Sequence, residues 1–292
     1  MFWVYSVGVA VAYGLQGVLI VRFAQQRDPW LVTTCRNLSF LGTFFPFVLL
    51  YSGLPALQQI ILGHSLLLGL GAVFGCCSMW CRNSALKIYP VGVLTAVIVT
   101  AQTLSMVIFD VVWSGRVISA ANGIMGFVIV IGSITCTWFS KTKAEPCSRR
   151  VSGQAIFLGI ACGLLMTAAV IPLVEVCTQA DALAAGFVWE IYIGLWAGLA
   201  SAIHFALDPE WRKLNRCTYR EVLWIAVAGF PAVLATVWMA LAAQLGPMGL
   251  VFAVEVSSVV ITTALAWAFL KEPINRMQGL VVLGVVALRA GL

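Results

Sequence analysis

The residues from Gly246 to Leu288 read GPMGLVFAVEVSSVVITTALAWAFLKEPINRMQGLVVLGVVAL and decide the class of fold. Two apolar runs flank a short charged segment, Lys271 to Arg276. Each run is long enough to cross a bilayer as a helix, which takes about 20 residues. Pro273 suits the first turn of a new helix, where a backbone N–H is not needed. We therefore predict two spanning helices joined at a membrane surface, with Glu255 inside the first of them.

The composition of the whole chain agrees with this local pattern. The 292 residues are 62% hydrophobic and only 10% charged, whereas soluble domains are about 45–50% apolar and about 25% charged. The apolar runs are continuous, which favours helices over the alternating strands of a barrel. We expect an all-α integral membrane protein.

Ten apolar runs are predicted as membrane helices, and short connections make neighbouring helices antiparallel. Their approximate spans are 3–21, 31–51, 65–86, 91–112, 118–139, 151–173, 187–207, 221–243, 248–270 and 275–290. The basic linker 141–150 separates two halves of five helices each, residues 1–140 and 151–292. Glycines spaced by four residues, such as Gly159 and Gly163, favour close packing of helices.

The two halves align as repeats. The fourth and fifth runs fall on the ninth and tenth, so that Asn122-Gly123 lies over Gln278-Gly279. Because five is odd, two copies joined end to end must face opposite ways across the membrane. This predicts an inverted repeat, with a binding site near the bilayer midplane between the halves.

The ninth and tenth runs resemble the EamA family of the drug/metabolite transporter superfamily. The residues that carry the resemblance are the small and apolar ninth run, then Leu270-Lys271-Glu272-Pro273, Gln278-Gly279 and Gly284. Pro29 and Arg36 at the start of the second run fit the same pattern. The resemblance covers almost the whole chain and implies a carrier that moves small organic metabolites, often outward, without ATP.

The first half departs from this family pattern. Arg116 stands where the hallmark glutamate would be, and Asn122 replaces the glutamine. These departures put in doubt a surface ion pair in that half.

Basic residues predict the orientation in the membrane. Loops after odd-numbered helices contain Arg22, Arg27, Lys87, Lys141, Lys143, Arg149, Arg150, Arg212, Lys213, Arg216, Arg220, Lys271 and Arg276, whereas the opposite side has only Arg116 and Arg289. The positive-inside rule places the first group in the cytoplasm and both termini outside, whereas the resemblance implies both termini inside. The net charge of +6 therefore indicates anchoring, and no nucleic-acid partner is expected. We expect a bacterial inner membrane.

Glu255 is the main candidate for substrate recognition, because charged side chains inside a membrane helix are rare and mark functional sites. Ser258 and Thr262 follow on the same helix face. Gln102 and Thr95 lie on the repeat-equivalent fourth run. The carboxylate could bind a cationic group or exchange a proton; the alternative is a structural hydrogen bond or contact with the interface.

Further candidates come from other runs. Arg36 and Glu190 could pair with each other, bind the two ends of a zwitterion, or extend to lipid headgroups. Arg82, close to Lys87, is predicted as an interfacial anchor. Aromatic side chains could contact a cationic substrate. The candidate substrate-binding residues are Glu255, Ser258, Thr262, Gln102, Thr95, Tyr13, Gln16, Trp80, Trp238, Arg36 and Glu190.

No cofactor, metal site or enzymatic activity is predicted. The nine cysteines are odd in number and lie mostly in apolar runs, which favours reduced thiols. Cys76, Cys77 and Cys81 have no histidine nearby, and His64 is expected in a loop. We expect a secondary transporter of small organic metabolites or amphipathic, cationic compounds, as a monomer or homodimer in lipid. A membrane-embedded enzyme, a lipid scramblase and a non-transporting adaptor remain open alternatives.

Overall fold

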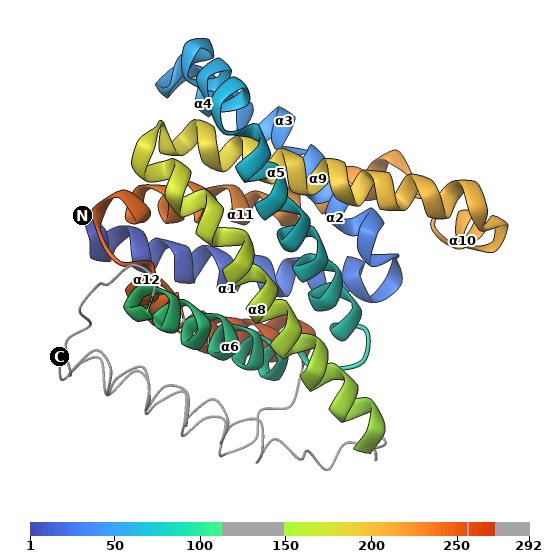
Figure 1. Cartoon of the computed structure of the whole chain (residues 1–292). Helices are drawn as coiled ribbons and strands as arrows, with labels where there is room; N and C mark the ends of the chain where they lie inside the picture. The colour runs from blue at the N-terminus through green and yellow to red at the C-terminus, as the bar shows by residue number, and fades with distance from the viewer. Residues whose placement is uncertain (113–148, 256, 272–292) are drawn as a thin grey trace.

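The computed structural model describes residues 1–112, 149–255 and 257–271, and every regular element in these ranges is a helix (Figure 1). Seven helical stretches are long and apolar enough to cross a membrane. The prediction of an all-helical membrane protein is therefore confirmed. The predicted helices 118–139 and 275–290, most of the linker 141–150, and the charged turn after Lys271 lie outside the described residues.

Within each described range, the elements follow one another with short connections. They are α1 (Phe2–Gln26), α2 (Pro29–Leu38), α3 (Phe40–Thr43), α4 (Phe45–Tyr51), α5 (Gly53–Ala85), α6 (Val91–Val112), α8 (Arg149–Gln179), α9 (Ala182–Leu207), α10 (Pro209–Leu214), α11 (Tyr219–Leu245), α12 (Met248–Glu255), α13 (Ser257–Leu265) and the π-helix η1 (Ala266–Leu270). The membrane-spanning candidates are α1, α5, α6, α8, α9, α11 and the stretch from α12 to η1.

The second predicted helix, 31–51, is not continuous. It is broken at Ser39 and Phe44 into the short helices α2, α3 and α4. Pro46 explains the second break, because it cannot donate a hydrogen bond and its ring crowds the carbonyl of Gly42 one turn earlier. Ser39 and Phe44 themselves keep right-handed helical backbone angles.

The third predicted helix starts earlier than the hydropathy indicated. Gly53, the first residue of α5, has a φ of 77°, a left-handed conformation that glycine adopts readily. Leu57 and Ile60 are buried one turn apart, so they attach the first turns of α5 to the bundle. His64 therefore lies inside a helix, and its prediction as a loop residue was wrong.

Glycines allow the helices to pack closely, as predicted. A Cβ atom built on Gly163 of α8 would lie 2.5 Å from the carbonyl oxygen of Ile98 in α6. One on Gly71 of α5 would lie 2.9 Å from the carbonyl of Ala169 in α8. The absence of side chains at these points brings α8 into contact with both α5 and α6.

Two ends of the bundle can be distinguished. At the end that we call the basic end, Arg27 after α1 forms an ion pair with Glu221 and donates a 2.9 Å hydrogen bond to the carbonyl of Leu214. At the N-terminal end, Ser52 donates a 2.7 Å hydrogen bond to Asp181. The loops after α1 and α9 thus meet at one end, as the distribution of basic residues predicts.

Helices α6 and α12–α13 run in opposite directions along each other. Gly92, at the start of α6, lies against Thr263 near the end of α13. Further along α6, Thr103 donates a 3.2 Å hydrogen bond to the carbonyl of Phe252. These contacts place the fourth and ninth predicted helices side by side with Glu255 between the two points.

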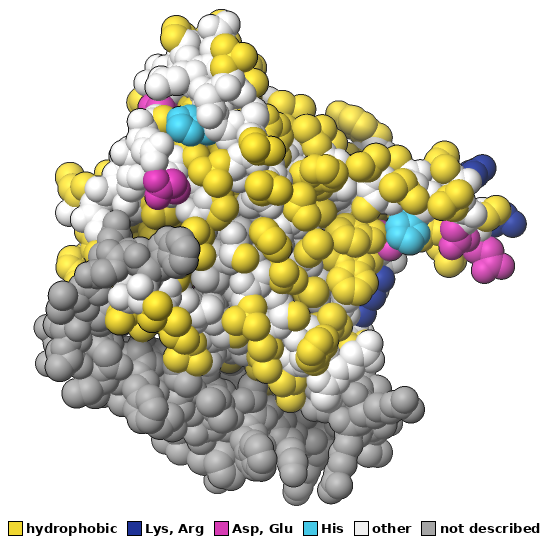
Figure 2. All heavy atoms as spheres, viewed as in Figure 1, with side chains coloured by type: hydrophobic (Ala, Val, Ile, Leu, Met, Phe, Trp, Pro, Cys, Tyr) yellow, Lys and Arg dark blue, Asp and Glu magenta, His cyan; other side chains and the backbone are white. Residues whose placement is uncertain are grey.

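The outer surface suits a lipid environment. Figure 2 shows hydrophobic side chains spread over the face of the bundle, with charged side chains mainly toward the projecting end where α9 leads into α10 and at the upper left. Leu62, Leu66, Phe157 and Leu195 are among the large apolar side chains exposed on the bundle.

Candidate functional site

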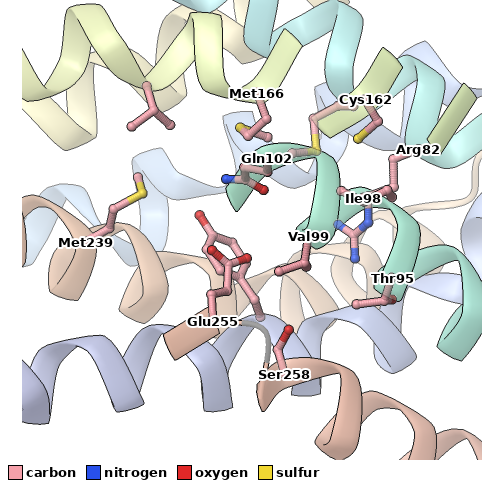
Figure 3. Close-up of a pocket in the computed structure, with 13 residues that line it drawn as sticks. Arg82, Thr95, Ile98, Val99, Gln102, Cys162, Met166, Met239, Glu255 and Ser258 are labelled. Atoms are coloured by element: carbon pink, nitrogen blue, oxygen red, sulfur yellow. The ribbon is translucent and has the colours of Figure 1, made fainter. Parts of the chain in front are cut away.

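A small internal cavity lies between the spanning helices (Figure 3). Its volume is about 60 Å³, and six of the seven spanning stretches contribute to its wall, α9 being the exception. This space holds only a few water molecules, because each needs at least about 10–15 Å³ by the same measure. The wall consists of Tyr13, Met79, Arg82, Thr95, Ile98, Val99, Gln102, Cys162, Met166, Val170, Met239, Glu255 and Ser258.

Glu255 is the acidic side chain of this wall. It ends α12, and only 5% of its surface is exposed. Its Oε2 atom has no hydrogen-bond partner among the described residues, and neither has the hydroxyl of Ser258 in the first turn of α13. Since buried polar groups without partners are costly, both atoms are available to a ligand or water in the cavity.

Helix α6 supplies the opposite polar wall. Gln102 is buried, and Thr95 donates its hydroxyl to the carbonyl of Val91 at 2.8 Å. The fold thus brings Glu255 and Ser258 together with Gln102 and Thr95, as the alignment of the two runs predicted.

Arg82 is a cavity residue that the sequence interpretation missed. Its guanidinium lies in the same wall as Glu255, on the other side of Val99 in Figure 3. Arg82 was predicted as an interfacial anchor, but the face of α5 that carries Ser78, Met79 and Arg82 turns inward, toward α8 and α1. Arg82 follows Met79 by three residues and Ser78 by four, which puts it on their helix face, and this spacing was a signal that could have revealed it.

No carboxylate oxygen in the described part of the chain lies within 4.0 Å of a guanidinium nitrogen of Arg82. Its side-chain hydrogen bond goes from Nη1 to Oε1 of Gln16 at 3.4 Å. Gln16 is buried but is not part of the cavity wall. It therefore acts on the cavity through Arg82.

Sulfur atoms make up much of the remaining wall. Met79, Met166 and Met239 reach the cavity from α5, α8 and α11. Thioether side chains are flexible and polarizable and adapt to apolar or aromatic groups. Tyr13, predicted as a cavity residue, lies in the same wall. The cavity therefore combines two opposite charges with an adaptable apolar surface.

Arg36 and Glu190 form a buried network next to the cavity, and Nη1 of Arg36 donates a 3.4 Å hydrogen bond to the sulfur of Met79 in the cavity wall. Nη2 of Arg36 lies 3.6 Å from Oε1 of Glu190. The same carboxylate accepts hydrogen bonds from Asn37 at 2.7 Å and Thr236 at 2.6 Å. Of the alternatives left open by the sequence, the structure shows these two residues paired with each other.

The other candidates lie outside the cavity wall. Thr262 donates a 3.3 Å hydrogen bond to the carbonyl of Gly14. Trp80 is 36% exposed and stacks on Trp30, with ring centroids 5.8 Å apart. Trp238 packs against Gly8 of α1.

Metal ligands do not gather within the described residues, where no group of three or more His, Cys, Asp or Glu side chains could hold an ion. The described cysteines, which include Cys76, Cys77, Cys81 and Cys162, are free thiols. Cys162 contributes to the cavity wall, where its sulfur lies 3.2 Å from the hydroxyl of Ser78.

Comparison with known proteins defines the class of fold. No protein-family model and no curated protein matches the chain. Solved structures do, with 26 matching chains. One of them, described simply as a crystal structure of a protein, superposes with a TM-score of 0.69 at 16% sequence identity, over 97% of this chain and 94% of that chain. The chain thus shares its helical fold over nearly its full length with a solved structure.

Proposed function

We propose that this protein is a secondary transporter of small organic compounds, of the EamA type, and works as an exporter by alternating access. The observation that supports this most is the internal cavity with Glu255 in its wall, which has a buried carboxylate oxygen without a partner. Ionisable side chains at membrane depth are typical of substrate and ion pathways. A cavity formed by six spanning stretches also suits a protein whose helices rearrange around a ligand.

The proposal includes two inverted five-helix halves, residues 1–140 and 151–292. The antiparallel contact of α6 with α12–α13 supports it, because these helices are repeat partners in the sequence alignment and both line the cavity. A site between partners of an inverted repeat is the plan of many carriers. We further propose a bacterial inner membrane as the location, with the basic end in the cytoplasm.

The size of the cavity bears on the transport cycle. Pockets for drug-sized ligands have about 300–1,000 Å³, well above the 60 Å³ found here. The compact state is thus suited to small ligands, and larger ones require the helices to separate. Separation at one end while the other stays closed is the movement that alternating access needs.

Transport in proteoliposomes tests this function. Compounds are first screened by stabilisation of the purified protein, because a ligand that binds the folded state raises its melting temperature. The screen includes amino acids, amines, nucleosides and cationic drugs. Each stabilising compound is then measured as flux, with and without an imposed pH gradient. We expect flux that requires the protein, and a loss of at least tenfold in Glu255→Gln.

The matched control is Glu175→Gln, which changes an exposed glutamate of α8 and should leave the flux unchanged. Equal flux in wild type and Glu255→Gln would show that Glu255 has no role in transport. If bound compounds do not cross the membrane, while a labelled lipid in the same vesicles changes leaflet, the protein is a scramblase and the proposal is wrong.

A further inference from the structure

We infer that the cavity binds a small zwitterion, a molecule with one ammonium and one carboxylate group, in preference to a simple cation or anion. This inference rests on the proposed transport function, and it narrows the substrate class. It comes from the charged side chains that face the cavity, from the polar atoms left without partners there, and from the small volume of the cavity.

Two opposite charges share the cavity without pairing. Glu255 and Arg82 both lie in its wall, yet no ion pair within 4.0 Å joins either of them to another side chain in the described ranges. Oε2 of Glu255 has no partner, and Arg82 has a long hydrogen bond of 3.4 Å to Gln16. Charges taken out of water are destabilising unless they are paired and hydrogen-bonded. A ligand that satisfies both charges at once is therefore favoured.

The charge balance distinguishes between classes of ligand. A simple cation bound to Glu255 would share a cavity of about 60 Å³ with the guanidinium of Arg82, and like charges inside one small cavity repel each other. A simple anion bound to Arg82 would meet the carboxylate of Glu255 in the same way. A zwitterion adds no net charge and offers a partner to each. The buried pair of Arg36 and Glu190 is already neutral and leaves this balance unchanged.

The polar atoms around the two charges extend the argument. The hydroxyl of Ser258 is buried without a partner, one turn after Glu255. Gln102 comes from α6 to the same space (Figure 3). Both can hydrogen-bond an ammonium or a carboxylate. Met79, Met166 and Met239 provide room for a short apolar group on the ligand.

Three matched compounds test the inference on the purified full-length protein. L-norvaline carries both charges on a propyl chain; butylamine is the same molecule without the carboxylate, and pentanoate is the same molecule without the ammonium. The measurement is the concentration of each that gives half of the maximal rise in melting temperature. We expect the concentration for norvaline to be at least tenfold lower than for butylamine or pentanoate. Equal values for norvaline and either single-charge compound, or no stabilisation by norvaline, overturn the inference.

Two variants test which side chain of the protein binds which charged group of the ligand. In Arg82→Gln, norvaline should lose its advantage over butylamine, because the partner of the carboxylate is gone. In Glu255→Gln, norvaline should lose its advantage over pentanoate. Lys87→Gln is the matched control, since Lys87 is an exposed cation just beyond the end of α5, and should keep the wild-type order. If a variant does not fold, the comparison of the three compounds on the wild-type protein still tests the preference for a zwitterion.

The outcomes of this test and of the transport test can be told apart. Norvaline that binds with the expected preference but does not cross a proteoliposome membrane contradicts the transporter, while the zwitterion site stands. A simple amine that is transported, with no preference for norvaline, contradicts the zwitterion site while transport stands.

Discussion

The carboxylate of Asp110, near the end of α6, accepts a 2.7 Å hydrogen bond from the backbone amide of Gly249 in the first turn of α12. Asp110 is 1% exposed. The first amides of a helix have no partner within it and carry partial positive charge, so an acidic side chain from another helix stabilises this end.

This contact predicts that Asp110→Ala lowers the stability of the protein by about 1–2 kcal/mol, the usual range for a lost cap and dipole interaction. Asp110→Asn should lose less, because the amide oxygen can still accept a hydrogen bond. The measurement is the thermal unfolding midpoint in detergent. Asp208→Ala is the control, as Asp208 caps the exposed helix α10 and should have the smaller effect. An unchanged midpoint in Asp110→Ala would contradict the capping role.

A second prediction concerns the pair of Arg36 and Glu190. Removing one partner leaves a buried charge without compensation, and such changes destabilise by about 3–5 kcal/mol. We expect Glu190→Gln and Arg36→Met each to be strongly destabilising. The double variant should be clearly more stable than the sum of the two single effects, because it leaves no lone charge. A double-mutant cycle of unfolding midpoints measures this coupling, and additive effects would show that the pair contributes nothing.

The third prediction compares two glycines of α8. A Cβ at Gly163 would lie 2.5 Å from the carbonyl oxygen of Ile98 and 2.7 Å from the Cβ of Ala101. Gly163→Ala should therefore cost about 1–3 kcal/mol, as in other overpacked sites. At Gly153 an added Cβ meets nothing within 4 Å, so Gly153→Ala should be neutral or stabilising by up to about 1 kcal/mol. The same unfolding assay compares both, and equal effects would refute close packing of α8 on α6.

The fourth prediction is the orientation in the membrane. Lys213 lies at the basic end, and Tyr51 lies at the opposite end and is 77% exposed. By the positive-inside rule, Lys213→Cys should react with a membrane-impermeant maleimide only after the cells are opened. Tyr51→Cys should react in intact cells. Mass spectrometry of the modified peptides separates these positions from the native cysteines. The reverse pattern would support the orientation implied by the EamA resemblance.

The sequence predicted those cavity residues that are polar and lie inside an apolar run. Glu255 and Ser258 were predicted because a charge inside such a run, with a hydroxyl one turn later, has few explanations other than an inward face. Arg82 was missed because a basic residue near the end of a run, close to Lys87, also fits a lipid interface. Whether a long side chain turns inward or toward headgroups depends on which helix covers it, and that is a property of the packing.

The course of the backbone was predicted less well than the class of fold. Average hydropathy showed where most helices lie, but it did not reveal the break before Pro46 or the start of α5 at Gly53. Both features depend on single residues with special backbone properties, and an average over many positions hides them. The partners of Arg36 and Glu190 were left open, because residues far apart in a sequence give no direct sign that they meet.

The three methionines of the cavity wall have a chemical consequence. Oxidation of a thioether gives a sulfoxide, which is polar and chiral. Modification of Met79, Met166 or Met239 would place a strong hydrogen-bond acceptor in the wall of the cavity. A molecule oxidised at these positions would therefore present a more polar pocket to any compound that enters it.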